Sequence, residues 1–330
     1  MAGLGIGLLG AARITDKAVI HPTRVIPQTY IAAVAARDRT RAESFAAKHN
    51  IGAVLDSYDD VIGSEDVALI YNPLPINLHA DWTIKALEAG KPVLCEKPFA
   101  MNTDEARAML AASEASGQRL IEAFHYRYHP AFETCLAWLA ADEIGELKEI
   151  HAAFDVEIKD NGTEIRHRVE TGGGAMMDLG CYPLHWALSV TGEAPKEVEA
   201  SATLTAAGVD ESMRAELSFP SGAVAHLTTN MGPGAEFRAE MKLVGTAGEI
   251  TFVNPLAPHN KFIPGRLTSS RGWEAEISPI STYTYQLATV WDALQTGVPL
   301  PTEGDMILRQ QIVLDAVYES AGLKHLRYLE

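Results

Sequence analysis

A lysine that follows a short apolar segment is the first residue of the chain that could move a proton. Pro92-Val93-Leu94-Cys95 predicts a buried parallel strand, and Glu96-Lys97-Pro98 comes directly after it. Ligands of open α/β sheets bind outside the carboxyl ends of the strands, where Lys97 would lie. A partly desolvated lysine gives up its proton readily. Lys97 is therefore a candidate for moving a proton on or off a substrate hydroxyl; the alternative is a surface salt bridge with Glu96.

The segment from Gly172 to His185 holds a second group of residues that could do chemistry. Its three opening glycines predict a flexible turn before a helix. Asp178, Tyr182 and His185 are spaced by four and by three residues, so they would line one face of that helix. A carboxylate, a phenol and an imidazole on one face can hold a polyol and carry a proton. The alternative is a purely structural helix, with Asp178 near its positive end and the two rings capping a core.

Three arginines lie close to these segments in the sequence. Arg166 and Arg168 come just before the glycines, and Arg127 belongs to a stretch rich in aromatic and basic residues, 125–129. Each guanidinium could bind substrate oxygens or a cofactor phosphate, or could belong to a solvated loop. We expect Arg127 and Arg166 to take part in substrate binding.

A glycine motif near the start of the chain predicts a dinucleotide site. The segment 4–10 reads as a short strand that runs into G-x-G-x-x-G, and a helix is expected to open directly after it. In this pattern Gly5 allows a tight turn, Gly7 lets the backbone approach a pyrophosphate, and Gly10 lets the helix pack on the strand. The amides at the start of the helix would face the phosphates. The cofactor-site residues expected here are Gly5, Gly7, Gly10, Ala12, Arg13 and Ile14.

The end of the second predicted strand, residues 30–36, bears on the choice between NADP and NAD. NAD sites usually place an acidic residue at this point, where it bonds the ribose 2′-hydroxyl. Alignment of the apolar segment puts Ala36 at that position and Arg37 next, which leaves room and positive charge for a 2′-phosphate. We therefore expect NADP. NAD is the alternative, in which Asp38 would be the ribose acid.

Strands alternate with helices through the first third of the chain. Further strands are expected near 53–55, 67–71, 92–95 and 119–123, with helices near 39–49, 57–63, 77–88 and 103–116. Such alternation predicts a doubly wound parallel sheet. Asn77 and Asn102 would cap two of the helices, and His79 would face the same edge as Lys97 or only bond the backbone. The cofactor-site residues expected at these strand ends are Asn72, Pro73, Leu74, His79, Glu96 and Lys97.

The alternation of strands and helices ends after Ala123. A strand from 147 to 158 and four more near 197–206, 212–219, 223–231 and 238–246 predict an open, mostly antiparallel sheet, with helices near 281–296 and 304–323. The fold class is therefore α/β, with a Rossmann domain (1–123) and an α+β domain for substrate binding and oligomerisation (124–330). A sheet face without helices needs a cover, so we expect a homodimer or homotetramer.

Composition excludes several classes of partner. The net charge of -16 argues against nucleic acid and anionic membranes. Three cysteines without CxxC spacing predict reduced thiols in a cytoplasmic protein, and no signal peptide or membrane-spanning segment is expected. No metal site is expected, because His, Asp and Glu do not cluster outside the pocket.

Together, the glycine motif, Glu96-Lys97-Pro98 and the segment G-G-G-x-x-x-D-x-G-x-Y at 172–182 resemble the Gfo/Idh/MocA family of oxidoreductases. The resemblance covers nearly the whole chain. It implies hydride transfer between a nicotinamide cofactor and a carbinol carbon of a sugar, a cyclitol or a related diol. By this resemblance Lys97 matches the catalytic lysine and Asp178 the pocket aspartate.

One departure from the common family pattern narrows the expectation. Many members have D-x-G-x-H-x-x-D at this segment, whereas Tyr182 stands at the histidine position here and His185 at the final acid. Tyrosine resembles the branch with dimeric dihydrodiol dehydrogenase, NADP-dependent D-xylose dehydrogenase and glucose-fructose oxidoreductase. Ala-Ala-Arg-Asp at the end of the second strand resembles the same branch, which implies NADP and argues against an inositol dehydrogenase.

The resulting hypothesis makes Lys97 and Tyr182 an acid/base pair. The lysine charge would favour a tyrosinate that accepts the hydroxyl proton as hydride leaves carbon. Asp178 would orient the substrate or tune Lys97, and His185 would bind a second hydroxyl. The alternatives are a reductase of keto-sugars or 1,5-anhydrofructose with the same residues, and a non-catalytic NADP-binding regulatory protein.

Overall fold

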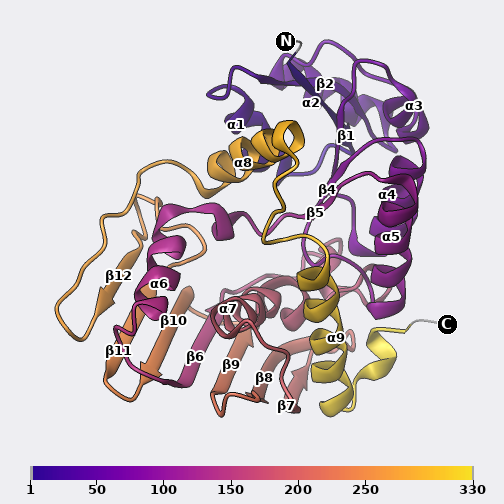
Figure 1. Cartoon of the computed structure of the whole chain (residues 1–330). Coiled ribbons are helices and arrows are strands. Elements are labelled where there is room, and N and C mark those ends of the chain that lie inside the picture. The colour runs from indigo at the N-terminus through magenta and orange to yellow at the C-terminus, as the bar shows by residue number, and fades with distance from the viewer. Residues whose placement is uncertain (1–2, 329–330) are drawn as a thin grey trace. The chain divides into compact units, whose positions relative to one another are not determined.

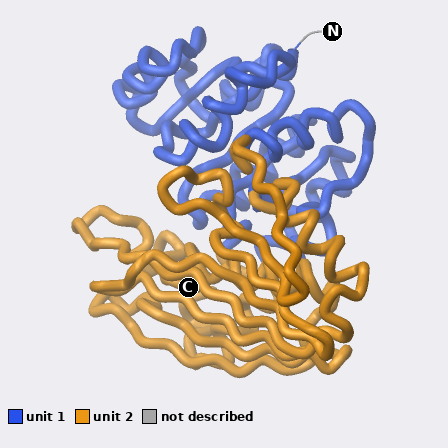
Figure 2. The backbone as a smooth tube through the Cα atoms, turned by 90° about the vertical axis from the view of Figure 1, so that its left-hand side faces the viewer, with its two compact units in different colours: residues 1–100, 104–125, 283–308 blue, residues 101–103, 126–282, 309–330 orange. Residues whose placement is uncertain are grey.

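The computed structural model describes residues 3–328 and divides the chain into two compact units (Figures 1 and 2). The first unit contains residues 1–100, 104–125 and 283–308, and the second contains 101–103, 126–282 and 309–330. The boundaries of these units differ from the single division after residue 123 that the sequence predicted. The chain returns to the first unit late, because the Arg119 guanidinium binds the Glu303 carboxylate at 2.6 Å and the Ala293 carbonyl at 2.5 Å.

The first unit is built on a five-stranded parallel sheet in the order β2-β1-β3-β4-β5. Its strands are β1 (Leu4–Leu9), β2 (Thr29–Ala35), β3 (Leu69–Asn72), β4 (Val93–Cys95) and β5 (Leu120–Glu122). The expected strand near 53–55 is reduced to a single parallel bridge between Val54 and Val34 at the free edge of β2. With that bridge counted, the order is that of a dinucleotide-binding Rossmann sheet.

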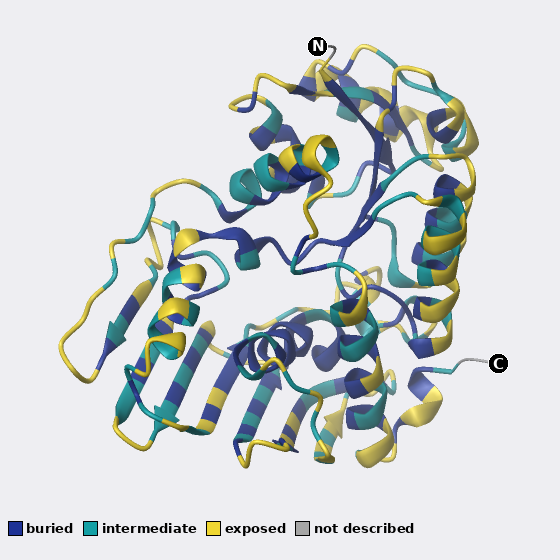
Figure 3. Ribbon diagram, viewed as in Figure 1, coloured by how far each residue is buried: buried dark blue, intermediate teal, exposed yellow. Residues whose placement is uncertain are grey.

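Continuous apolar sequence forms these strands because both faces of the sheet are covered. All of β1, β3, β4 and β5 is buried, as Figure 3 shows. The helices of this part of the chain are α1 (His21–Thr23), α2 (Arg39–His49), α3 (Tyr58–Gly63), α4 (His79–Glu88), α5 (Thr103–Ser116) and α8 (Thr282–Thr296).

The helix cap expected at Asn77 is wrong. Asn77 lies in a short 3-10 turn, Ile76–Leu78, and α4 begins at His79 without a side-chain cap. Asn102, expected to cap α5, donates to the Arg327 carbonyl at 2.9 Å, and the amide of Thr103, the first of α5, donates to the Asp315 carboxylate at 2.8 Å. A residue far along the sequence therefore binds the start of α5.

The second unit is built on a seven-stranded sheet in the order β12-β11-β10-β6-β9-β8-β7. Its strands are β6 (Leu147–Asp155), β7 (Glu197–Leu204), β8 (Asp210–Ser218), β9 (Val224–Asn230), β10 (Arg238–Gly245), β11 (Gly248–Val253) and β12 (Arg266–Ser269). Only the pairing of β6 with β9 is parallel, so the sheet is mostly antiparallel, as predicted. The last two strands were not expected.

The two faces of this sheet differ in character. One is apolar and is covered by helices, with α7 (Cys181–Thr191) packed on β6 and β9; α6 (Pro130–Ala140) and α9 (Asp305–Ser320) lie on the same side (Figure 1). The other face has no helix over it and carries polar and charged side chains such as His151, Arg214 and Lys242. The uncovered face is therefore polar, and the assembly of subunits over it stays a prediction.

Within residues 3–328, no helix is both long and apolar enough to cross a membrane.

Candidate active site

The loop after β1 is shaped for close approach to a ligand. Gly10 has φ +93°, a conformation that favours glycine, and its amide donates to the Ala35 carbonyl at 2.7 Å. A Cβ on Gly10 would lie 3.2 Å from the Leu74 side chain, so the ends of β1 and β3 meet here. The strand order reverses between β1 and β3, which is where open α/β sheets bind their ligands.

The other two glycines of the motif have different roles from those expected. Gly5 and Gly7 lie within β1 rather than in the turn. A Cβ on Gly5 would lie 2.0 Å from the Asp66 carbonyl oxygen, and one on Gly7 would lie 2.7 Å from Val61. Both glycines are therefore required by packing. The tight turn belongs to Gly10 and the residues after it, and Ala12, Arg13 and Ile14 lead into a helix that starts near Asp16.

The carboxyl end of β2 presents an exposed arginine. Arg37 is exposed there and has no ion-pair partner among residues 3–328. The Asp38 carboxylate is the N-cap of α2, where it accepts hydrogen bonds from the amides of Thr40 at 2.9 Å and Arg41 at 3.4 Å. The Arg41 guanidinium donates to the Ala11 carbonyl at 2.8 Å and so ties α2 to the loop after β1.

The turn after β3 is held by buried polar groups. The Asn72 side chain donates to Thr83 at 3.1 Å and accepts from the Leu74 amide at 3.3 Å, and neither Asn72 nor Pro73 is exposed. His79 is 1% exposed, and its two ring nitrogens contact the carbonyls of Leu74 at 2.8 Å and Phe99 at 3.1 Å. The expected contact of the His79 side chain with a cofactor is therefore wrong, because its nitrogens are used internally. Burial lowers the pKa of His79.

Lys97 lies at the carboxyl edge of the sheet, as the sequence predicted, and it is partly exposed. The buried Glu96 carboxylate accepts hydrogen bonds from the Tyr71 hydroxyl at 2.6 Å and from the Lys97 main-chain amide at 3.3 Å. Tyr71, on the neighbouring strand β3, therefore helps to hold the Glu96 carboxylate at this edge. Glu122, opposite Cys95 in the sheet register, is 1% exposed, and burial raises the pKa of its carboxyl well above the usual range.

The edge formed by these loops fits a dinucleotide. It offers a glycine turn at the switch point, an unpaired arginine at the end of β2 and a lysine at the end of β4. Backbone amides and cations of this kind bind phosphate groups, and the lysine lies where the reacting end of a ligand would be.

In the second unit, Asp178 is paired with an arginine. It lies in a π-helical turn, Met176–Gly180, and its Oδ2 is 2.7 Å from Nε of Arg166. A second carboxylate, that of Glu164, lies 2.8 Å from the same guanidinium. The Asp178 charge is the main cause that raises the pKa of Arg166. The two predicted substrate-site residues therefore form one charged group.

The three consecutive glycines before this turn are each needed. Gly172 has φ +74° and Gly174 has φ +125°. A Cβ on Gly173 would lie 2.5 Å from the Arg166 carbonyl oxygen, and one on Gly174 would lie 2.0 Å from Oδ1 of Asp210. The segment is thus a tightly packed bend and not the flexible turn that the sequence indicated.

Tyr182 and His185 follow in α7, which continues directly from the π-helical turn, so the predicted common face is interrupted by a change in helix pitch. Tyr182 is 5% exposed and its ring packs edge-on against Phe154. His185 has no exposed surface, and its Nδ1 faces the hydroxyls of Tyr126 and of Ser189, the latter at 3.3 Å. Burial lowers the pKa of His185 to about 3. The expected contact of His185 with substrate is therefore wrong.

Arg127 and Arg168 are both engaged within the second unit. The Arg127 guanidinium is paired with Glu133 and lies 5.4 Å from the centre of the Phe132 ring. Arg168 donates to the Gly162 carbonyl and is paired with Glu170 at 3.4 Å.

One functional support in this unit was missed by sequence reasoning. Asp210 is fully buried at the start of β8; its carboxylate accepts from the Met176 amide at 2.6 Å and from the Tyr318 hydroxyl at 2.7 Å. It thereby holds the start of the turn that carries Asp178. No local signal marks Asp210, because its partners are distant in the sequence.

Comparison with known families places the chain. Residues 4–124 match the family model "Oxidoreductase family, NAD-binding Rossmann fold", and residues 132–251 match the "GFO/IDH/MocA C-terminal domain". The chain is an oxidoreductase of the Gfo/Idh/MocA family, with an NAD(P)-binding Rossmann fold.

Three similar proteins illustrate the range of that family. A D-xylose 1-dehydrogenase (NADP(+)) from Haloferax volcanii is 32% identical over 96% of both chains. A trans-1,2-dihydrobenzene-1,2-diol dehydrogenase from Xenopus tropicalis is 35% identical over 64% of both. A 3-ketoreductase from Actinomadura kijaniata, solved in complex with NADP and TDP-benzene, is 25% identical; the match covers 96% of this chain and 98% of that one, with a TM-score of 0.86.

Proposed function

We propose that this protein uses NADP to transfer a hydride between the nicotinamide and a carbinol carbon of a sugar, a cyclic polyol or a dihydrodiol. Lys97 and Tyr182 act as the acid/base pair. The proposal combines the family membership with two residues, Lys97 in the first unit and Tyr182 in the second. A xylose dehydrogenase and a dihydrodiol dehydrogenase among the relatives support the substrate class.

The choice of NADP rests on a single observation at the end of β2. A ribose acid presents its carboxylate oxygens to the sugar hydroxyls, but Asp38 already uses Oδ1 to cap α2. Arg37 is exposed at the same strand end and has no ion-pair partner among the residues described. A guanidinium in that position would neutralise a 2′-phosphate through charge-assisted hydrogen bonds.

Each residue has its own role in the proposed reaction. The nicotinamide, when bound, supplies or accepts the hydride. Tyr182 takes the proton of the substrate hydroxyl as the carbon–hydrogen bond breaks, so that the substrate is oxidised to a carbonyl compound and the proton stays on the phenol oxygen. The positive charge of the Lys97 ammonium favours the tyrosinate form of Tyr182 and stabilises the negative charge that develops on the substrate oxygen. Asp178, oriented by Arg166, holds a further hydroxyl.

The second candidate is the reverse reaction, reduction of a keto-sugar by NADPH. Relatives named dTDP-3,4-didehydro-2,6-dideoxy-alpha-D-glucose 3-reductase favour it; the one from Saccharopolyspora spinosa is 34% identical over 77% of this chain. The same residues would catalyse this reduction, and Tyr182 would donate the proton to the carbonyl oxygen of the keto-sugar. The alternative of another class is a non-catalytic NADP-binding regulatory protein.

Substitution of Arg37 tests the cofactor assignment. Arg37→Ala should raise KM for NADP+ about tenfold to a hundredfold and leave KM for NAD+ unchanged, because only the 2′-phosphate loses its cation. Arg39→Ala is the matched control: Arg39 is also exposed but is paired with Glu43 at 2.9 Å, and it should change neither value. Equal effects of the two variants, or a wild type that prefers NAD+, would refute the assignment.

A further inference from the structure

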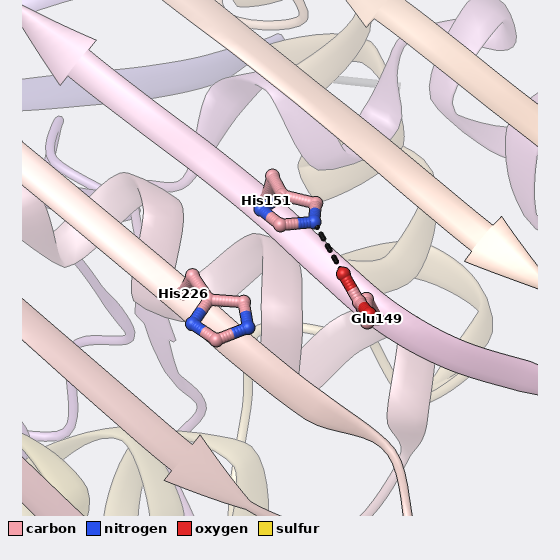
Figure 4. Close-up of side chains that lie close together, drawn as sticks. All are labelled: Glu149, His151 and His226. Carbon is pink, nitrogen blue, oxygen red and sulfur yellow. Dashed lines mark hydrogen bonds and ion pairs between the residues drawn. The ribbon is translucent and has the colours of Figure 1, made fainter.

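The uncovered face of the seven-stranded sheet carries a group of metal-ligating side chains. His151 on β6 and His226 on β9 are partners in the parallel register, and Glu149 lies two residues before His151 on the same face (Figure 4). One potential ligand atom from each of the three lies within 4.8 Å of the others. Among residues 3–328, no other group of His, Cys, Asp and Glu meets this condition.

The two imidazoles are arranged in parallel. Their ring centres are 5.0 Å apart with an angle of 17° between the planes. Nε2 of His151 lies 2.8 Å from the Glu149 carboxylate. Figure 4 shows a nitrogen of each ring directed to the side on which Glu149 lies. One nitrogen of each ring therefore lies on the side of the Glu149 carboxylate.

A fourth residue orients the second histidine. Nδ1 of His226 lies 3.2 Å from Oε2 of Glu216, which is its register partner on β8. A histidine that binds a metal commonly gives its other ring N–H to a carboxylate, which fixes the tautomer and strengthens the ligand nitrogen. Glu216 would do this for His226 and leave Nε2 for an ion.

We propose that Glu149, His151 and His226 bind a divalent transition-metal ion of the zinc class. Two imidazoles and one carboxylate are the donor set that such ions prefer, and they leave at least one position for water. The donors are anchored on two adjacent strands of a sheet, so their spacing is set by the β-ladder. Each side chain is about half exposed, 50%, 47% and 40% in that order, so the ion can exchange with solvent. The site lies on the sheet face that α7, which carries Tyr182, does not cover.

Titration calorimetry with Zn2+ alone, in a buffer without chelating or phosphate ions, tests the proposal on the full chain. We expect one ion per chain, with binding weakened at least tenfold in His151→Ala and in His226→Ala. Glu216→Gln should weaken binding about tenfold, since it removes only the orienting carboxylate.

His21→Ala is the matched control. His21 is an exposed histidine next to a carboxylate, with Nε2 3.2 Å from Asp16, but it has no second imidazole beside it. Its variant should bind Zn2+ as the wild type does. The proposal is overturned if the wild type shows no saturable binding, or if His151→Ala and His226→Ala bind as tightly as His21→Ala. Melting curves without metal should coincide for all variants, because these side chains are exposed.

Discussion

At the residue scale, burial decides which of the polar side chains can react. His79, His185 and Asp210 are all fully or almost fully enclosed, and each has polar atoms in contact with neighbours within the protein. Residue types and spacing predicted which segments would carry functional groups. They could not separate His185, which supports the core, from Asp178, which is partly exposed and paired with Arg166, because that difference depends on contacts with distant residues.

The enclosed imidazole of His185 makes stability depend on pH. Its pKa is about 3 in the folded protein and about 6.5 in an unfolded chain, so the unfolded state binds more protons between these values. The free energy of unfolding therefore falls as the pH falls. From pH 7.5 to pH 5.5 this group alone should remove about 1.4 kcal/mol.

Urea unfolding of wild type and His185→Gln at both pH values measures this contribution. The variant should lose less stability than the wild type over the interval by about that amount. His21→Gln, at an exposed histidine, should behave as the wild type does. An identical pH dependence in wild type and His185→Gln would show that the imidazole is not held neutral by burial.

At the element scale, two bends position the chemistry: the loop after β1 and the glycine segment before the π-helical turn. Strand, helix and glycine patterns predicted both bends, and the order of strands and helices in the first unit followed from alternation. The roles of single glycines did not follow. Gly5 and Gly7 accommodate the Asp66 carbonyl and Val61, which come from later parts of the chain, and pattern alone contains no such information.

Gly174→Ala tests the packing of the second bend. The added Cβ would meet Oδ1 of Asp210 at 2.0 Å, and φ is +125°, so we expect a loss of at least about 3 kcal/mol in stability. Gly222→Ala is the control, with φ +90° and open space around the Cβ; it should cost about 1 kcal/mol. Denaturant melts compare the two. Equal losses would mean that only the backbone angle matters and that the contact with Asp210 is unimportant.

At the scale of the whole molecule, the two residues proposed as the acid/base pair come from different compact units. Lys97 belongs to the first and Tyr182 to the second. Sequence reasoning predicted two domains but not their interleaving, because the return of residues 283–308 depends on the long-range contacts of Arg119. Assembly into a dimer or tetramer stays a prediction from family resemblance, and since the open face is polar, an interface there would be sensitive to salt. Sedimentation of a monomer alone would contradict it.

The measurement that tests the central claim most directly is reduction of NADP+ or NAD+, followed by nicotinamide absorbance, for wild type, Lys97→Ala and Tyr182→Phe. The substrates are an aldose, a cyclic polyol and a trans-dihydrodiol, with keto-sugars assayed against NADPH. We predict turnover with NADP(H), a loss of 10²- to 10⁴-fold in kcat for both variants, and unchanged NADPH binding by fluorescence. Turnover at the wild-type rate in Lys97→Ala would contradict the account.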